Sequence, residues 1–250
     1  MNEGQKGLKQ LLGESFGFFR EHWRRLSVVT LFVYVPLETL AVLFFVFFGI
    51  EPGTKKTTFS TEESLLRLLF SLISAVFYLF YQVAILKTIE SSDKKNGITA
   101  SSAYGEAFSL FWPLLGVVLR VVVRVILWSL LLIIPGIIFA IFYSFANMAF
   151  LFDGKKGYEA LIFSKQIVKP YLGKFLGNSF VAILVLLPVY IFITIILSLI
   201  FGGYDPKEPT LSGVIGVGVG NIASALASIY LLIFFYHLYK ELKSRRGGVS

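Results

Sequence analysis

The sequence predicts an all-α, polytopic integral membrane protein with six transmembrane helices. Of its 250 residues, 56% are hydrophobic and 15% are charged, and the mean hydropathy is +0.77. A soluble domain carries about 25% charged residues, because water has to solvate its surface. Six apolar segments are long enough to cross a hydrocarbon core, which takes roughly 20 helical residues. None of them alternates as a barrel strand does.

The chain begins with an amphipathic N-terminal segment, residues 1–25. Over residues 7–25 the apolar side chains recur at helical spacing among basic ones, which predicts a helix lying at the membrane interface. A cleavable signal peptide has a shorter charged region and a small-residue cleavage site, so we expect this N-terminus to be retained. The first span follows at residues 26–50 and stops at Glu51-Pro52-Gly53.

The second span covers residues 64–86 and follows Ser60-Thr61-Glu62-Glu63, a capping-box pattern that starts helices. The third and fourth spans form one apolar run over residues 112–152. This run is too long for one crossing and fits two, so we expect a tight hairpin at Ile134-Pro135-Gly136.

The fifth span covers residues 179–201 and the sixth covers residues 213–238, before a basic tail at residues 239–250. The spans form a six-helix bundle over residues 26–238, and the whole chain is predicted to be one membrane domain. Two stretches between spans are predicted to be further amphipathic interfacial helices, residues 103–111 and residues 158–176.

The basic residues are distributed unevenly between the two sides of the membrane. With both termini on one side, 17 of the 23 Lys and Arg residues fall on that side, 3 on the other and 3 within the spans. Basic loops of membrane proteins tend to stay in the cytoplasm. We therefore expect a multi-pass protein of the cell membrane with cytoplasmic N- and C-termini.

Charged residues inside spans are candidates for function. Glu38 lies 12 residues into the first span, and Arg124 lies 12 residues beyond Trp112 on a span of the same direction. A charge near the bilayer centre costs at least about 2.5–3.5 kcal/mol, which predicts that Glu38 and Arg124 pair, with Arg120 one turn away. The cluster is interpreted either as a structural pair or as an ion, proton or anionic-headgroup site.

Two further groups of residues within the spans invite interpretation. Polar side chains of the second and fourth spans either bond helices together or wet a cavity; they are Ser74, Tyr78, Gln82, Tyr143 and Asn147. Small residues recur every four positions on the sixth span and predict close helix packing, within the chain or in a homodimer; they are Gly216, Gly220, Ser224 and Ser228.

Lysines follow the fourth span on the expected cytoplasmic side. Juxtamembrane lysines attract anionic headgroups, so these are predicted to contact lipid; they are Lys155, Lys156, Lys165, Lys169 and Lys174.

Enzymatic chemistry has little support in the composition. The chain has no cysteine and two histidines, and no metalloprotease, nucleophile-elbow or P-loop motif is present. We therefore predict a protein that is not an enzyme, with no metal or other cofactor and no nucleic-acid partner.

One region supplies a family resemblance. Residues 131–177 read LLIIPGIIFAIFYSFANMAFLFDGKKGYEALIFSKQIVKPYLGKFLG, with an IIPGIIF hairpin, an aromatic and polar fourth span, an acidic-glycine turn and a lysine-rich helix beginning EAL. This stretch resembles the membrane domain attached to some glycerophosphoryl diester phosphodiesterases and its free-standing six-span relatives. That family's catalysis belongs to a separate soluble barrel, which no segment of this sequence resembles. The resemblance implies an integral membrane module.

Two functional hypotheses follow. The first is a non-catalytic membrane protein that engages lipid, chiefly anionic, or a membrane partner through its basic cytoplasmic face. The second is a small transporter or channel that uses an intramembrane Glu/Arg site. Short outer loops favour the first, and Pro36 and Pro188 favour the second, because kinked spans often line cavities.

Overall fold

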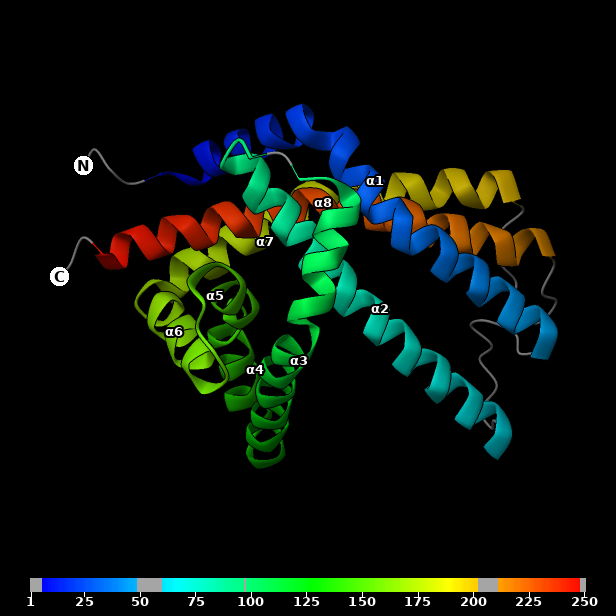
Figure 1. Ribbon diagram of the computed structural model, residues 1–250, viewed down its shortest axis with the longest axis horizontal. Coiled ribbons are helices and arrows are strands. Elements are labelled where there is room, and N and C mark those ends of the chain that lie inside the picture. Colours follow the sequence, from blue (N-terminus) through cyan, green and yellow to red (C-terminus); the bar gives the residue numbers. More distant parts are fainter. Residues whose placement is uncertain (1–5, 49–59, 97, 202–210, 248–250) are drawn as a thin grey trace.

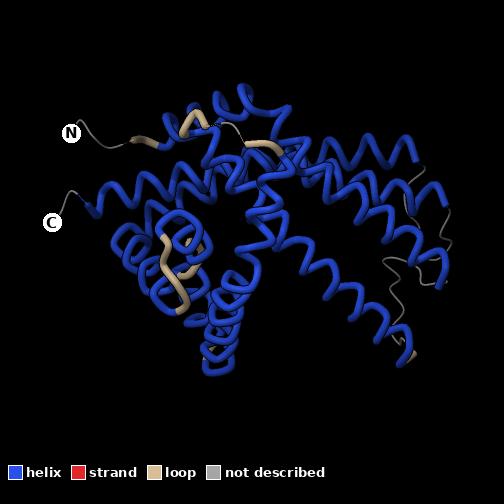
Figure 2. The backbone as a smooth tube through the Cα atoms, in the orientation of Figure 1, coloured by secondary structure: helices blue, strands red, loops and turns tan. Residues whose placement is uncertain are grey.

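The computed structural model describes residues 6–48, 60–96, 98–201 and 211–247, and within these ranges its regular elements are all helices (Figure 2). Six helical stretches are long and apolar enough to cross a membrane, which confirms the prediction of an all-α, multi-pass protein. In chain order the elements are α1 (Leu8–Phe48), α2 (Thr61–Asp93), α3 (Ala100–Leu131), α4 (Ile133–Phe142), α5 (Ala146–Asp153), α6 (Tyr158–Val168), the 3-10 helix η1 (Lys169–Tyr171), α7 (Leu172–Phe201) and α8 (Leu211–Gly247).

The helices converge at the end of the molecule where both termini lie, which we call the terminal end (Figure 1). From there α1, α7 and α8 extend together, and α3 runs with α4 in another direction. Helix α2 extends in a direction between these two groups. Large buried side chains such as Phe145, Phe234 and Tyr239 form the core at this end. Farther out, α3, α4 and α7 expose many apolar side chains, as suits a surface whose solvent is lipid.

The long helices extend past the predicted spans. The amphipathic N-terminal segment and the first span form one 41-residue helix, α1, which continues through Pro36 and bends part-way along (Figure 1). Likewise, residues 103–111 are the first turns of α3, and residues 239–247 of the tail continue α8. These segments are therefore continuous in helix with their spans: no glycine or proline interrupts residues 20–30 or 232–245, and α3 continues through Pro113. Their placement at the membrane interface stays a prediction.

The start of α2 confirms the capping-box prediction. The hydroxyl of Ser60 accepts a hydrogen bond from the Glu63 amide at 3.1 Å, and the Ser60 amide donates to the Glu63 carboxylate at 3.2 Å. These two bonds satisfy amide groups that have no partner within the helix. The helix start is therefore encoded locally.

The α3–α4 hairpin turns at Leu132 rather than at Pro135-Gly136. Leu132 is extended, with φ −158° and ψ 135°, and α4 begins at Ile133. The predicted turn position is wrong because Pro135 lies in the first turn of α4, where an amide has no partner within the helix to lose. Gly136 instead packs directly against Ser129 of α3.

The fourth span is broken into α4 and α5 at residues 143–145, where the sequence predicted one continuous helix. Fully buried Ser164 of α6 bridges this break, because its hydroxyl donates to the Phe142 carbonyl at 2.7 Å and accepts from the Phe145 amide at 3.1 Å. The hydroxyl thus supplies partners that the interrupted helix lacks. The bridge fixes α6 against the α3–α4 hairpin.

Small residues of α8 face α7 of the same chain. A Cβ atom built on Gly216 would lie 2.8 Å from the Phe201 Cβ, and one on Gly220 would lie 3.7 Å from the Leu197 Cδ1. Ser224 lines the same interhelical space, while Ser228 donates to the carbonyl of Ala225. The close packing predicted for Gly216 and Gly220 is therefore found within one chain.

We expect Gly216→Ala to lower the thermal midpoint of the protein in detergent micelles. The new methyl group would overlap the Phe201 Cβ, and overpacking costs about 1–3 kcal/mol. Gly220→Ala is the matched control, because its methyl group would make an ordinary contact. Equal midpoints for the two variants would contradict the packing.

Candidate functional site

The predicted Glu38–Arg124 pair is not formed. Glu38 accepts a hydrogen bond from the Asn221 side chain at 3.0 Å, and the Arg124 guanidinium lies 4.0 Å from the ring centroid of Tyr158. Among the described residues no ion pair joins Glu38 to Arg124 or Arg120. The prediction fails because equal depth on two spans brings side chains together only if the helices stay adjacent, and α1 and α3 diverge (Figure 1).

Arg124 instead lies with residues of α6 around a cavity of about 750 Å³ between α3, α4 and α6. Arg124 enters from α3, and Tyr158 and Lys165 enter from α6. The Lys165 ammonium lies 5.2 Å from the ring centroid of Phe139, within cation–π range. Arg120 passes close by, since a Cβ on Gly157 would lie 3.6 Å from its Cζ. We call this space the α3–α4–α6 cavity.

The cations of the cavity lack acidic partners. In the described part of the chain, no carboxylate lies within 4.0 Å of the charged nitrogens of Arg124 or Lys165. The Arg124 guanidinium lies over the Tyr158 ring, and a cation–π contact of this kind does not require its N–H donors as hydrogen bonds. The rest of the wall is apolar and is formed by Leu127, Trp128, Leu130, Leu131 and Phe139 with Tyr143.

The remaining predicted headgroup lysines have different surroundings. Lys156 and Lys169 are exposed, and the Lys155 ammonium lies 5.7 Å from the ring centroid of Phe163. Lys174 already has hydrogen-bond partners inside the protein, because it donates to the Glu241 carboxylate at 3.3 Å and to the Lys6 carbonyl at 3.1 Å. The placement of Lys174 among the headgroup ligands is therefore wrong.

The predicted polar span residues divide into two kinds. Asn147 of α5 donates to the Gln82 side chain of α2 at 3.0 Å, which is the helix-bonding role. Ser74 and Tyr78 of α2 line a cavity with Glu38, and Tyr143 lines the α3–α4–α6 cavity. The helix-bonding interpretation thus holds for Asn147 and Gln82, and the interpretation of a wet cavity stays a prediction for the other three.

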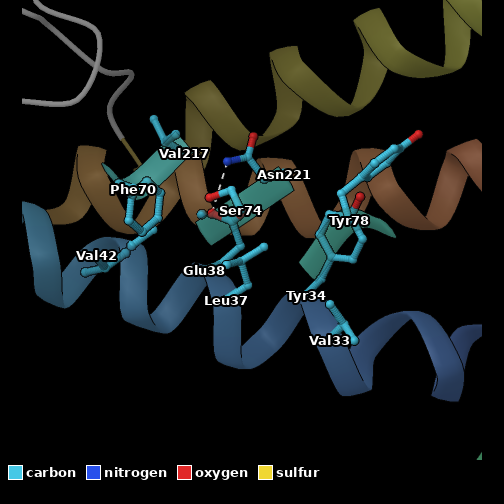
Figure 3. A pocket seen from close by; sticks show the side chains of 12 residues that line it. Val33, Tyr34, Leu37, Glu38, Val42, Phe70, Ser74, Tyr78, Val217 and Asn221 are labelled. Carbon is cyan, nitrogen blue, oxygen red and sulfur yellow. Dashed lines mark hydrogen bonds between the residues drawn. The ribbon is translucent and has the colours of Figure 1, made fainter. Parts of the chain in front are cut away.

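The cavity beside Glu38 lies between α1, α2 and α8 and has a volume of about 330 Å³. In Figure 3 the amide of Asn221 and the carboxylate of Glu38 meet across it from α8 and α1. Gly218 lies at the wall of this cavity, and a Cβ there would make ordinary contacts, 3.6 Å from the Val42 Cγ2 and 3.9 Å from the Glu38 carboxylate. Sequence reasoning missed Asn221 because one amide on a helix carries no signal of the helix it faces.

A second feature missed from the sequence is a polar cluster at the terminal end. The Ser15 hydroxyl lies 3.0 Å from the His237 Nδ1, and Asp93 accepts from Tyr236 at 2.9 Å and Lys240 at 2.6 Å. This is not a catalytic triad, because Ser15 is fully buried and donates to the Leu11 carbonyl at 2.7 Å. The cluster joins the first turns of α1 to the last turns of α2 and α8.

Comparison with known proteins gave no matching family model, no similar curated protein and no matching solved structure. The resemblance to the membrane domain of glycerophosphoryl diester phosphodiesterases stays a prediction.

Proposed function

We propose that this protein is a non-catalytic integral membrane protein that binds an anionic phospholipid in the α3–α4–α6 cavity. The observation that carries the proposal is the presence of Arg124 and Lys165, both without acidic partners, beside an apolar wall. In this proposal the lipid phosphate accepts from both cations. One acyl chain then follows Leu127 and Leu131 along α3.

The energetics support a lipid over a free anion. A basic residue near a charged membrane surface contributes about 1 kcal/mol, so two of them give only modest affinity for a small anion. The acyl chains of a lipid instead hold it in the membrane beside the cavity, so its phosphate meets the two cations at a high effective concentration that a free anion does not have. The space of about 750 Å³ is open on one side, where Leu130 and Leu131 are largely exposed, so a lipid can enter it from the surrounding membrane.

Orientation is part of the same proposal: the terminal end faces the cytoplasm of the cell. The side of the membrane that holds both termini carries 17 basic residues and the other side carries 3, which supports this orientation. The positions of the basic residues near the cavity support it as well. Arg120, Lys156 and Lys169 all flank the cavity region of α3 and α6, where they add positive potential for inner-leaflet anionic lipid.

The test is lipid affinity measured on the purified full chain in micelles. Phosphatidylglycerol is expected to bind more tightly than phosphatidylcholine with the same acyl chains, and high salt should reduce the difference. Combining Arg124→Gln with Lys165→Gln should weaken phosphatidylglycerol binding by about 30-fold, which corresponds to about 2 kcal/mol.

The matched control combines Lys9→Gln with Arg20→Gln, which removes the same charge from exposed positions of α1, a helix that does not line the cavity, and should change the affinity much less. Glycerol 3-phosphate distinguishes a lipid headgroup from a free phosphate as the source of the bound anion. It should bind far more weakly than the lipid, because it lacks acyl chains. Equal losses in the two double variants would reject the cavity as the binding site.

A further inference from the structure

The Glu38 cavity is a second polar site, separate from the lipid cavity. Its residues come from α1, α2 and α8, none of which contributes to the α3–α4–α6 cavity. Figure 3 shows the Glu38 carboxylate directed across the space toward Asn221, with Ser74 beside them. A carboxylate within an apolar span is retained at a cost, and such residues often mark a pathway or ligand site.

Glu38 has a polar partner but no counter-charge. The Asn221 amide satisfies one of about four acceptor sites on the carboxylate. No cationic side chain in the described residues forms an ion pair with Glu38, and none lines its cavity. The site is therefore complementary to a positive charge.

The walls indicate what kind of cation fits. Aromatic rings of Tyr34, Phe70 and Tyr78 line the cavity (Figure 3), and an aromatic face attracts an organic cation as strongly as it attracts Lys or Arg. Edge-on packing holds Tyr34, whose ring lies 5.1 Å from that of Tyr81, while the ring of Tyr78 is half exposed and lies 6.3 Å from Tyr81. Hard metal ions instead require six or more oxygen ligands, and the described residues include no cluster of acidic and histidine side chains.

We propose that this cavity binds a small organic ammonium ion, with Glu38 as its counter-charge and the aromatic rings as its walls. The volume of about 330 Å³ lies at the lower end for ligand sites, which limits the ligand to a compact molecule. The charged nitrogen would sit beside the free oxygen of Glu38, and its alkyl groups would contact Tyr34, Phe70 and Tyr78.

The test uses the purified full chain in micelles of an uncharged detergent. Tetramethylammonium chloride is titrated into this sample, and calorimetry measures the heat of binding. Sodium chloride at the same ionic strength tests charge alone, and tert-butanol tests size and apolarity alone. We expect saturable binding of tetramethylammonium and no binding of the other two. Added phosphatidylcholine should compete if the natural source of the ammonium is a lipid headgroup, and should leave the titration unchanged if the source is soluble.

Variants assign the binding to this cavity. Glu38→Gln keeps the shape and the hydrogen bond to Asn221 and should weaken tetramethylammonium binding at least 10-fold. Gly218→Leu leaves the charge but fills the space, since a Cβ there already lies 3.9 Å from the Glu38 carboxylate, and should also block binding. Glu21→Gln removes a charge from an exposed position on the same helix and should have no effect.

Three outcomes would overturn the proposal: no saturable binding to the wild-type chain, equal binding of sodium, or unchanged binding to Glu38→Gln. Because α3, α4 and α6 take no part, loss of phosphatidylglycerol binding in the Arg124 and Lys165 variants should leave this titration unchanged.

Discussion

Replacing Gly136 with alanine is expected to separate α4 from α3 and to destabilise the protein strongly. The new Cβ would lie 2.0 Å from the Ser129 hydroxyl oxygen and 2.8 Å from the Ser129 Cα. Rotation of the Ser129 side chain relieves the first overlap, but the second involves the backbone, so the hairpin itself has to open. Overpacking typically costs about 1–3 kcal/mol and occasionally more, and we expect the upper part of this range.

The thermal midpoint in micelles measures the global effect, and tryptophan fluorescence measures the local one. Trp128 stacks on Phe139 across the hairpin at 4.5 Å between ring centroids, so its emission should change when the two helices separate. The readout requires Trp23→Phe and Trp112→Phe as a background.

Gly105→Ala is the matched control for this prediction. It makes the same change within α3, where a Cβ would meet no atom within 4 Å, and should be neutral or stabilising because alanine favours helix over glycine by about 1 kcal/mol. Adding Ser129→Gly to Gly136→Ala should not restore the midpoint, because the Cα overlap remains. Full restoration would show that the clash lies in the side chain alone.

Glu241→Gln is expected to give the second large loss, by uncoupling α7 from α8 at the terminal end. The Glu241 side chain is 4% exposed and accepts from Arg245 at 2.7 Å and from Lys174 at 3.3 Å. The glutamine would leave both cations uncompensated in a partly buried site, and removal of one partner of a buried pair costs about 3–5 kcal/mol.

Thermal unfolding of single and double variants tests this coupling. Lys174→Gln added to Glu241→Gln should recover part of the loss, because it removes one of the two uncompensated charges. Glu14→Gln is the control, since Glu14 pairs with Lys6 at a half-exposed site, where such pairs contribute about 0–1 kcal/mol. Additive effects of the Glu241 and Lys174 changes would contradict the coupling.

The number of spans and the start of α2 could be predicted because the information is local. A run of about 20 apolar residues is sufficient for a helix to cross a membrane, whatever its neighbours do. The capping box is equally local, because Ser60 and Glu63 satisfy each other's backbone amides within one turn. The presence of unusual charges at Glu38, Arg120 and Arg124 was likewise visible in the sequence.

The partners of those charges were decided by the tertiary structure. Glu38 and Arg124 have matching positions along their spans, yet α8 brings Asn221 to the first and α6 brings Tyr158 to the second. Contact depends on the direction and rotation of whole helices, which are set by packing between residues far apart in the chain. Local patterns in the chain specify which segments are helical and apolar. The break bridged by Ser164 and the bond from Lys174 to Glu241 instead depend on distant helices meeting, because each buried polar group then needs a partner.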